Sequence, residues 1–403
     1  MSNERCVIVG GGHAARRGAQ ALRELAPLAR IVVIGAEHEL PYDRPVLSKG
    51  ALLAADGERA AFIRDATWYA EHRIELCLGA EVVEIDRAGA SVRLADGRRE
   101  AYGKLLIATG SRVRTLPFDT PGVRIHYVRT VADARALRAE LAPGKRVAIL
   151  GGGFIGLEVA ASAATLGCAT TLIEPAPALL QRAMPASIGT FMHALHTRHG
   201  VDIRVDTRPV SIGREGAAFI VETDRGTLAA DVIVAGIGVV PNVELAQQAG
   251  LEVNDGIVVD AGCRTRDALI FAAGEVTSHF NPLLGRHVRI ESWQVAENQP
   301  LVAAANMLGG QAEYAEVPWL WSDQYDCNVQ MLGTLTPGRP LVERRPGESA
   351  LIGFALDSAG RLEGVVTVNA GRDMSVCRRL MAAGKTVDAA ALADPSVPLR
   401  SML

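Results

Sequence analysis

Short apolar runs alternate with longer, alanine-rich stretches along most of this 403-residue chain. The runs have the length and β-branched composition of buried strands, and the longer stretches have helical length. Parallel strands need a crossover connection, which is usually a helix, so the alternation predicts an α/β class with largely parallel sheets. The expected strands cover 6–10, 30–34, 105–110, 146–150, 170–173 and 231–238, and the expected helices cover 13–23, 132–141 and 157–167.

The tail from about residue 317 has a different pattern. Residues 349–356 and 362–368 alternate in the manner of strands, and a helical stretch follows around 374–383. We therefore expect a small α+β domain there. Between 201 and 230 a strand meander precedes the run 231–238, which resembles 105–110 in leading to a glycine turn. This echo predicts that one nucleotide-binding domain is inserted into another.

Two glycine-rich fingerprints mark points where an apolar run gives way to a helix. The first reads Gly10-x-Gly12-x-x-Ala15 and the second Gly151-x-Gly153-x-x-Gly156. Such a turn holds a pyrophosphate on backbone N–H groups and a helix N-terminus. Two of them predict two dinucleotides, and therefore an electron donor and an electron acceptor.

An acidic residue about 20 positions beyond the glycines accepts hydrogen bonds from a ribose 2′-hydroxyl and repels a 2′-phosphate. Glu174 has this place after the second fingerprint and favours NADH over NADPH. The first fingerprint is less regular, and Glu37 is its best ribose ligand. Arg16 and Arg17 follow in the first helical turn, where they either attract a diphosphate or face solvent.

Composition excludes several classes. The formal charge of −3 gives no case for nucleic-acid or membrane binding, and no stretch has the length of a transmembrane span, which predicts a cytoplasmic protein. The six cysteines are scattered, form no C-x-x-C pair and predict no metal site. The segment Pro41–Lys49, where many two-dinucleotide enzymes carry a redox cysteine pair, holds no sulfur. A disulfide reductase or NADH peroxidase is therefore disfavoured.

A family resemblance rests on both fingerprints and on further segments. They are the sulfur-free stretch 41–49 and residues 107–110, 236–242, 270–276, 289–293, 318–324 and 392–399. With these, the chain resembles from end to end the NADH:ferredoxin reductases of Rieske-type aromatic-ring dioxygenases. It looks nearest to the phenylpropionate/cinnamate group, and putidaredoxin reductase-like and rubredoxin reductase-like proteins are near relatives.

The resemblance implies bound FAD, NADH as donor and a small [2Fe–2S] ferredoxin as acceptor. It also implies two Rossmann-like domains of glutathione reductase type and a C-terminal domain that covers the flavin. We expect a divided FAD domain at 1–112 and 236–316, an NAD domain at 113–235 and an interface domain at 317–403. Monomer and homodimer both stay open.

The family's cofactor contacts are carried over position by position. By resemblance the FAD contacts fall on Gly12, Ala14, Glu37, Arg44, Lys49, Val82, Arg129, Glu275 and Trp293. The second fingerprint, with Gly151, Gly153, Gly156, Glu158 and Glu174, is assigned to NADH. Further cofactor-binding positions are Gly10, Ala15, Ala108, Thr109, Gly110, Ile155, Gly236, Ile237, Gly238, Gly274, Glu291, Ser292 and Trp321. Glu275 replaces the family's Asp, so the same hydrogen bond requires a shift of about one methylene, and Ala36 replaces a frequent Asp.

Lys49 and Glu158 are the expected catalytic pair. By resemblance Lys49 lies beside the flavin and pairs with Glu158, which positions the nicotinamide; hydride transfer needs orientation more than proton shuttling. The residues alone also allow a solvated lysine and an exposed glutamate. His13 is either packed near the pyrophosphate or a capping or solvent residue, and Trp321 or Trp293 either lies on an electron exit path or is an ordinary core residue.

The acceptor's docking site is predicted from charge. Ferredoxins are generally acidic, so a basic patch in the tail would steer association. The candidates are Arg339, Arg344, Arg345, Arg378, Arg379 and Lys385, and the alternative is an ordinary solvated surface. Two further functions stay open: a reductase of rubredoxin or of a P450's ferredoxin, and a non-catalytic flavin- and NADH-binding redox sensor.

Overall fold

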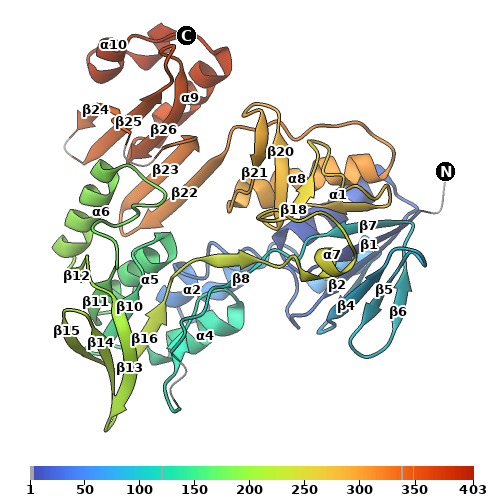
Figure 1. Cartoon of the computed structure of the whole chain (residues 1–403), viewed down its shortest axis with the longest axis horizontal. Coiled ribbons are helices and arrows are strands. Elements are labelled where there is room, and N and C mark those ends of the chain that lie inside the picture. Colours follow the sequence, from blue (N-terminus) through green and yellow to red (C-terminus); the bar gives the residue numbers. More distant parts are fainter. Residues whose placement is uncertain (1–3, 119–120, 337–338, 348) are drawn as a thin grey trace. The chain divides into compact units, whose positions relative to one another are not determined.

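The computed structural model describes residues 4–118, 121–336, 339–347 and 349–403 (Figure 1). The chain divides into two compact units that are interleaved in sequence. Unit 1 contains residues 1–45, 60–112 and 239–316, and unit 2 contains 46–59, 113–238 and 317–403. Within the described residues, no helix is both long and apolar enough to cross a bilayer.

Unit 1 is built on a five-stranded parallel sheet of order β19-β7-β1-β2-β3. Its strands are β1 (Arg5–Val9), β2 (Arg30–Gly35), β3 (Ile74–Leu78), β7 (Lys104–Ile107) and β19 (Ile270–Ala272), and its main helices are α1 (His13–Leu25), α3 (Ala66–Glu71) and α8 (Trp293–Met307). Successive side chains point to opposite faces of a strand. Ile8 and Leu106 accordingly face the core with α1 and α8, whereas Val7, Leu105 and Ile107 join a second core on the other face.

Smaller elements complete unit 1. They are β4 (Val82–Asp86), β5 (Ser91–Leu94) and β6 (Arg99–Ala101) in one antiparallel sheet, β18 (Ile257–Val259), β20 (Thr277–Asn281) and β21 (Arg286–Val288) in another, and α7 (Glu244–Gln248). The β8 strand (Ser111–Val113) and β17 (Val239–Pro241) lie where the sequence passes from one unit to the other.

Unit 2 repeats the same plan around a second five-stranded parallel sheet of order β12-β11-β10-β16-β9. Its strands are β9 (Ile125–His126), β10 (Arg146–Leu150), β11 (Ala169–Ile173), β12 (Asp202–Arg204) and β16 (Val232–Ala235). The meander is β13 (Pro209–Glu215), β14 (Ala218–Thr223) and β15 (Gly226–Ala230), and the helices are α2 (Gly50–Leu53), α4 (Val131–Glu140), α5 (Phe154–Thr165) and α6 (Ala186–Arg198). The short helix η1 (Gly57–Ala61) lies where the sequence passes from unit 2 back to unit 1.

The C-terminal residues of unit 2 form an antiparallel sheet of order β22-β23-β26-β25-β24. The strands are β22 (Trp319–Gln324), β23 (Cys327–Gly333), β24 (Val342–Gly347), β25 (Ala350–Leu356) and β26 (Leu362–Val368). Helix α9 (Gly371–Ala383) packs its buried Met374, Cys377 and Leu380 into the core of this sheet. Two short helices, α10 (Ala389–Ala393) and η2 (Leu399–Met402), end the chain.

The predicted α/β class and the α+β tail are confirmed. Every strand and helix expected from the apolar pattern is present, with ends shifted by a few residues. Residues 46–59 group with unit 2, although the boundaries implied by the resemblance placed them in the first part of the FAD domain. The division into three domains stays a prediction.

Candidate functional site

The second fingerprint forms a tight backbone cradle between β10 and α5. Gly151 has φ +112°, and a Cβ there would lie 2.5 Å from the carbonyl oxygen of Gly236. A Cβ on Gly156 would lie only 2.0 Å from the carbonyl oxygen of Gly151. Gly153 caps α5 without a side-chain hydrogen bond. The N-terminus of α5 therefore offers N–H groups and a positive dipole end to a phosphate.

Glycine 156 provides a direct test of this cradle. Gly156→Ala is expected to weaken NADH binding strongly and to lower the free energy of unfolding by about 1–3 kcal/mol, because its Cβ meets backbone that cannot swing aside. Thermal unfolding measures the loss of stability, and the dependence of flavin bleaching on NADH concentration measures the loss of NADH binding. Ala15→Gly, at the matching position of the other fingerprint, is the control and is expected to cost only about 1 kcal/mol. Unchanged NADH affinity in Gly156→Ala would contradict the cradle.

Glu174 lies at the rim of the second cradle. Its Oε2 accepts a hydrogen bond from the Gly152 N–H at 2.6 Å, and its Oε1 accepts one from the Ala176 N–H at 2.8 Å. A carboxylate has about four acceptor positions, so both oxygens keep room for ribose hydroxyls. Four further residues that were predicted to bind cofactor lie around this cradle. Ile155 is an exposed side chain in the first turn of α5, and Gly236, Ile237 and Gly238 follow β16.

The first fingerprint makes an equivalent cradle in unit 1. Gly10 has φ +128°, and a Cβ there would lie 2.1 Å from the carbonyl oxygen of Ala108. Gly12 caps α1 with no side-chain hydrogen bond, and the first turn contains no acidic residue. Ala15 is fully buried, so its methyl group is already packed where the other fingerprint has Gly156. This end of α1 therefore also offers N–H groups and a positive dipole end to an anion.

Glu37 follows β2 and is held by two partners. It accepts a hydrogen bond from the Tyr42 hydroxyl and one from Arg44 Nη2, the latter at 2.8 Å. Burial disfavours the Arg44 cation, but Tyr42 and Glu37 outweigh it, so the pKa of Arg44 is raised. Glu37 is thereby oriented at the end of β2, the position from which a carboxylate reaches a ribose.

The other predicted cofactor-binding residues of unit 1 are distributed over several strand ends, loops and turns. Gly274 has φ +89°, and its Cβ would approach that of Ala14 to 3.0 Å. Glu275 accepts a hydrogen bond from the Ser111 hydroxyl at 2.9 Å. Thr109 exchanges hydrogen bonds with Asn242. Val82 is buried in β4, Gly110 has φ +61°, Glu291 pairs with Arg289, and Ser292 caps α8.

His13 belongs to a buried charge cluster that the sequence did not reveal. It contacts the carboxylates of Asp43 and Glu297, and Trp293 Nε1 donates to Asp43 at 3.0 Å. Arg16 and Arg17 pair with Glu297 at 2.9 and 2.8 Å. The alternative of a solvent-exposed Arg16 is wrong, because this side chain is buried and its charge is compensated by Glu297. The signal available in the sequence was the helical spacing that places His13 and the two arginines in one turn.

The charge cluster predicts a pH-dependent stability. Burial opposes a charge on His13, but hydrogen bonds with Asp43 and Glu297 outweigh it and raise the pKa above the ordinary 6.5. A raised folded-state pKa gives stability that is full below pH 6.5 and is lost as the pH rises through the folded pKa. The melting temperature is therefore expected to fall as the pH rises from 6.5 through the folded-state pKa of His13. In His13→Gln the melting temperature is expected to fall less over the same pH range. A pH series of melting curves checks this, with the exposed His287→Gln as control; an identical fall in His13→Gln would contradict it.

Lys49 and Glu158 meet within unit 2. Lys49 Nζ lies 3.0 Å from Glu158 Oε1, and the Ser48 hydroxyl donates to the other carboxylate oxygen. Glu158 is 4% exposed although it belongs to helix α5, which begins at the glycine cradle. An ionised carboxylate in such a place needs paired charge and hydrogen bonds. The alternatives of a solvated Lys49 and an exposed Glu158 are excluded.

The remaining predicted residues of unit 2 are Arg129 and Trp321. Arg129 is half-buried before α4, and its backbone N–H donates to Asp133 at 3.2 Å. The Trp321 ring stacks on that of Trp319, with centroids 4.9 Å apart and planes at 23°. Both tryptophans lie on β22 and are partly exposed. They are therefore neither fully buried core residues nor freely solvated.

The structure leaves fewer candidate residues for the basic patch that was predicted in the tail. Arg344 is buried and donates to four backbone carbonyls of the chain end, so its proposed docking role is wrong. Arg339 and Arg345 pair with Glu363 and Glu343, and Lys385 donates to the Leu403 carbonyl. Arg378 and Arg379 of α9 are left as candidates.

Burial keeps several of the cysteines in the thiol form. All six are free thiols, and burial raises the pKa of Cys6, Cys327 and Cys377 to about 12. Thiols that stay protonated are poor nucleophiles and poor metal ligands. In the part of the chain that the structure describes, no cluster of His, Cys, Asp and Glu could hold a metal ion.

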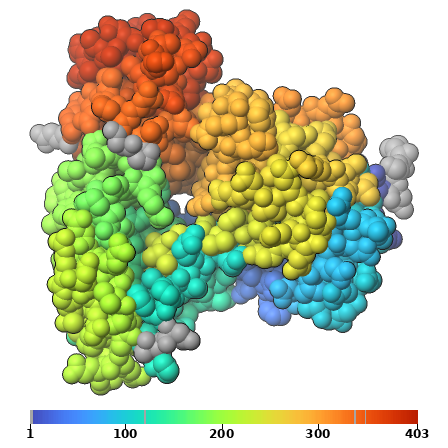
Figure 2. All heavy atoms as spheres, in the orientation of Figure 1, coloured from blue at the N-terminus to red at the C-terminus, as the bar shows by residue number. Residues whose placement is uncertain are grey.

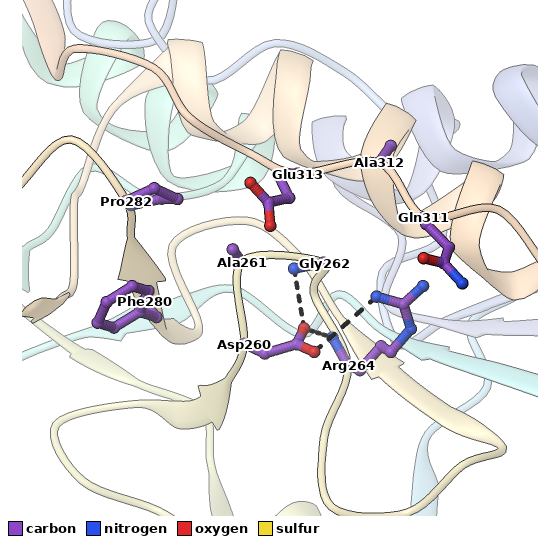
Figure 3. Close-up of a pocket in the computed structure, with 9 residues that line it drawn as sticks. All are labelled: Asp260, Ala261, Gly262, Arg264, Phe280, Pro282, Gln311, Ala312 and Glu313. Atoms are coloured by element: carbon purple, nitrogen blue, oxygen red, sulfur yellow. Dashed lines mark hydrogen bonds and ion pairs between the residues drawn. The ribbon is translucent and has the colours of Figure 1, made fainter. Parts of the chain in front are cut away.

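A separate open pocket of about 610 Å³ lies in unit 1 (Figure 3). Phe280 and Pro282 of the β20–β21 hairpin line one side, while Asp260 and Arg264 line another. Asp260 already accepts hydrogen bonds from the N–H groups of Gly262 and Arg264, both at 2.8 Å. The pocket contains none of the predicted site residues, so it does not change the assignment of the cradles.

Comparison with known families agrees with this geometry. Residues 4–299 match the pyridine nucleotide-disulphide oxidoreductase model, and residues 319–403 match the reductase C-terminal model. The chain belongs to the pyridine nucleotide-disulphide oxidoreductase family. Within that family, the absence of sulfur from 41–49 separates it from members that use a cysteine pair at that segment.

Curated relatives are similar over the whole chain. A Burkholderia cepacia protein named as the ferredoxin–NAD(+) reductase component of an anthranilate 1,2-dioxygenase system is 61% identical, with 100% of each chain covered. The corresponding p-cumate 2,3-dioxygenase component of Pseudomonas putida is 38% identical, with 98% of each covered. The 3-phenylpropionate/cinnamic acid component of Photorhabdus laumondii is 35% identical, with 95% and 97% covered. The anthranilate-system protein is thus more similar than the phenylpropionate one.

Solved structures agree as well. A covalent putidaredoxin reductase–putidaredoxin complex matches with a TM-score of 0.94 and 34% identity, covering 100% of this chain and 98% of the other. The ferredoxin reductase for the CYP199A2 system of Rhodopseudomonas palustris matches with a TM-score of 0.93 and 34% identity, covering 99% of each. The family uses FAD and NAD(H). Both fit the residues present, because Gly12 and Gly153 leave the start of each helix open, and neither helix has a side-chain cap that would compete with a phosphate.

Proposed function

We propose that this chain is the NADH:ferredoxin reductase component of an aromatic-ring dioxygenase system, which passes electrons from NADH through FAD to a [2Fe–2S] ferredoxin. The observation that carries the proposal is 61% identity over the full chain to a reductase of an anthranilate 1,2-dioxygenase system. Two nucleotide cradles in one chain support it, since a donor and an acceptor each need one. An oxidoreductase of aromatic catabolism follows.

The two cradles take different nucleotides. The cradle of unit 1, with Gly10, Gly12 and Glu37, holds FAD, and the cradle of unit 2, with Gly153 and Glu174, holds NADH. When bound there, FAD would supply the change from a two-electron hydride donor to a one-electron acceptor. We propose the same cofactor-binding role for the other residues that were carried over by resemblance. We also propose the FAD, NAD and interface domains with the boundaries predicted from the sequence. The enzyme works in the cytoplasm, where NADH and reduced thiols are available.

Lys49 and Glu158 orient the nicotinamide in this proposal. Glu158 lies on the helix whose N-terminus carries the second cradle, one turn beyond Gly153. The carboxylate fixes the Lys49 ammonium at 3.0 Å, and the fixed charge sets the position of the reacting ring. No group needs to give or take a proton in this step.

The partly exposed Trp319–Trp321 pair and the α9 arginines Arg378 and Arg379 belong to the same C-terminal sheet and helix. An acidic ferredoxin would be steered by these arginines, and its binding would weaken with added salt. We place the docking patch here.

Reduction of cytochrome c through a ferredoxin tests the function. The purified yellow protein is expected to reduce cytochrome c rapidly only when NADH and a dioxygenase-type [2Fe–2S] ferredoxin are both present, and to show slow oxidase activity without the ferredoxin. Failure of every ferredoxin to accelerate turnover would favour the redox sensor instead.

A reductase for a P450's ferredoxin is the second candidate, because the CYP199A2-system structure covers 99% of this chain at 34% identity. The same assay separates the two functions when dioxygenase-type and P450-type ferredoxins are compared. We expect a higher kcat/KM with the dioxygenase type, because identity to the anthranilate-system reductase is 61%.

A further inference from the structure

A continuous chain of hydrogen bonds leads away from the Lys49–Glu158 pair through the interior of unit 2. The Ser322 hydroxyl donates to Glu158 Oε1 at 2.6 Å, and Gln324 Nε2 donates to Ser322 Oγ at 3.0 Å. His196 Nε2 lies 2.7 Å from Gln324 Oε1. The Tyr325 hydroxyl lies 3.3 Å from the other ring nitrogen of His196.

The chain has a fixed direction. An ionised Glu158 only accepts hydrogen bonds, so the Ser322 proton points to the carboxylate. Ser322 Oγ must then accept from the amide of Gln324, whose oxygen is left to accept from His196 Nε2–H. The second nitrogen of His196 consequently accepts from Tyr325. Every donor points toward Glu158, an arrangement in which successive hydrogen bonds polarise one another.

The surroundings keep these groups in the required protonation states. His196 is fully buried, and burial lowers its pKa to about 4, so the ring is neutral with one donor and one acceptor nitrogen. Burial raises the pKa of Tyr325, so its hydroxyl stays a donor. Tyr325 has φ +55°, an uncommon conformation for a bulky residue, and its ring stacks on His199 with centroids 3.7 Å apart.

The alternation of β22 explains how the chain is built. Ser322 and Gln324 point inward and are buried, whereas Asp323 between them is exposed. On the other side of Glu158, the Ser162 hydroxyl of α5 donates to the Ser48 carbonyl at 2.8 Å and holds the Lys49 loop. In Figure 2 the green surface that contains α6 adjoins the orange surface of the C-terminal sheet.

We propose that Ser322 is a positioning residue for the Lys49–Glu158 pair, with its hydroxyl oriented by Gln324 and His196. Its hydrogen bond fixes the rotamer of the Glu158 carboxylate, and the carboxylate in turn fixes the Lys49 ammonium. The C-terminal region thereby completes the reacting end of the NADH site rather than only covering it. The effect on hydride transfer rests on the proposed function; the geometry of the chain does not.

Rapid-mixing kinetics of the FAD-loaded enzyme with NADH, without oxygen, test the positioning role. Ser322→Ala is expected to lower the limiting rate of flavin reduction about tenfold, with the NADH dissociation constant changed by less than about twofold. Ser322→Thr keeps the hydroxyl and is expected to recover most of the rate. Ser211→Ala is the control, because Ser211 also donates to a glutamate, Glu222, but on the exposed β13–β14 hairpin.

A double-variant cycle separates positioning from general structural damage. Once Lys49 is replaced by Met, adding Ser322→Ala is expected to change the rate by less than about twofold, because the group that Ser322 positions is gone. An equal slowing in both backgrounds would overturn the proposal, and so would an unchanged rate in Ser322→Ala alone.

NMR of 15N-histidine-labelled protein tests the chain independently of activity. We expect His196, identified by the signal lost in His196→Gln, to be neutral with its proton on Nε2. The chemical shift of this N–H signal is expected to change in Ser322→Ala and in Glu158→Gln, and to be unchanged in Ser211→Ala. A proton on Nδ1 of His196 would contradict the proposed hydrogen-bond chain. So would an N–H signal that is the same in Ser322→Ala, Glu158→Gln and the unaltered protein. If NADH fails to bleach the flavin of the unaltered protein, the proposed function falls, while this measurement still decides the chain.

Discussion

Lys49→Met is expected to slow NADH-driven flavin reduction roughly 10²-fold while FAD content stays near that of the unaltered protein. The ammonium lies 3.0 Å from a carboxylate that is 4% exposed, so its removal takes away the fixed charge and leaves Glu158 with hydroxyl donors only. Without its ammonium partner the carboxylate can leave its position, and no fixed charge is then left to orient the nicotinamide ring.

Rapid mixing with NADH and the flavin absorbance of the purified variant measure the rate and the FAD content. Lys145→Met is the matched control, because Lys145 is exposed and lies before β10 in the same unit. A rate in Lys49→Met equal to that of the control would make Lys49 a bystander.

Glu174→Ala is expected to lower kcat/KM for NADH by about 10- to 100-fold and to leave or raise the value for NADPH. The carboxylate is held in place by the N–H groups of Gly152 and Ala176, at 2.6 and 2.8 Å, and its remaining acceptor positions suit the ribose hydroxyls. The charge of Glu174 also repels a 2′-phosphate. Its removal therefore lowers the ratio of kcat/KM for NADH to kcat/KM for NADPH in two ways: NADH loses a contact and NADPH loses a repulsion.

Steady-state reduction with each nucleotide measures this preference. The exposed Glu222→Ala of β14 is the control and is expected to keep it. Equal rates with NADH and NADPH in the unaltered protein would contradict the claim that Glu174 selects NADH over NADPH.

Much of the fold could be predicted because its signals are local. The apolar runs ending at Val9 and Leu150 lead into glycine turns, and each turn has a backbone close approach that only glycine permits. Glu174 followed from spacing alone. The parallel sheets follow from the alternation of strand and helix, since crossover helices cover both faces of a parallel sheet and its strands then read as apolar runs.

The supporting side chains could not be predicted, because they come from distant parts of the sequence. Ser322 is 164 positions from Glu158, and Glu297 is 284 positions from His13. Only the fold brings these groups together, and single serines or glutamates have no periodic signal. Arg344 shows the opposite error: its charge suggested a surface, whereas the chain end provides four carbonyls that hold it inside.

The most direct test of the central claim is the number of [2Fe–2S] clusters reduced per NADH. The FAD-loaded protein is mixed without oxygen with a limiting amount of NADH and an excess of oxidised dioxygenase-type ferredoxin, and the reduced clusters are counted by electron paramagnetic resonance. A hydride carries an electron pair and each cluster accepts a single electron, so the account predicts about two reduced clusters per NADH. A bleached flavin that leaves the ferredoxin oxidised would contradict it.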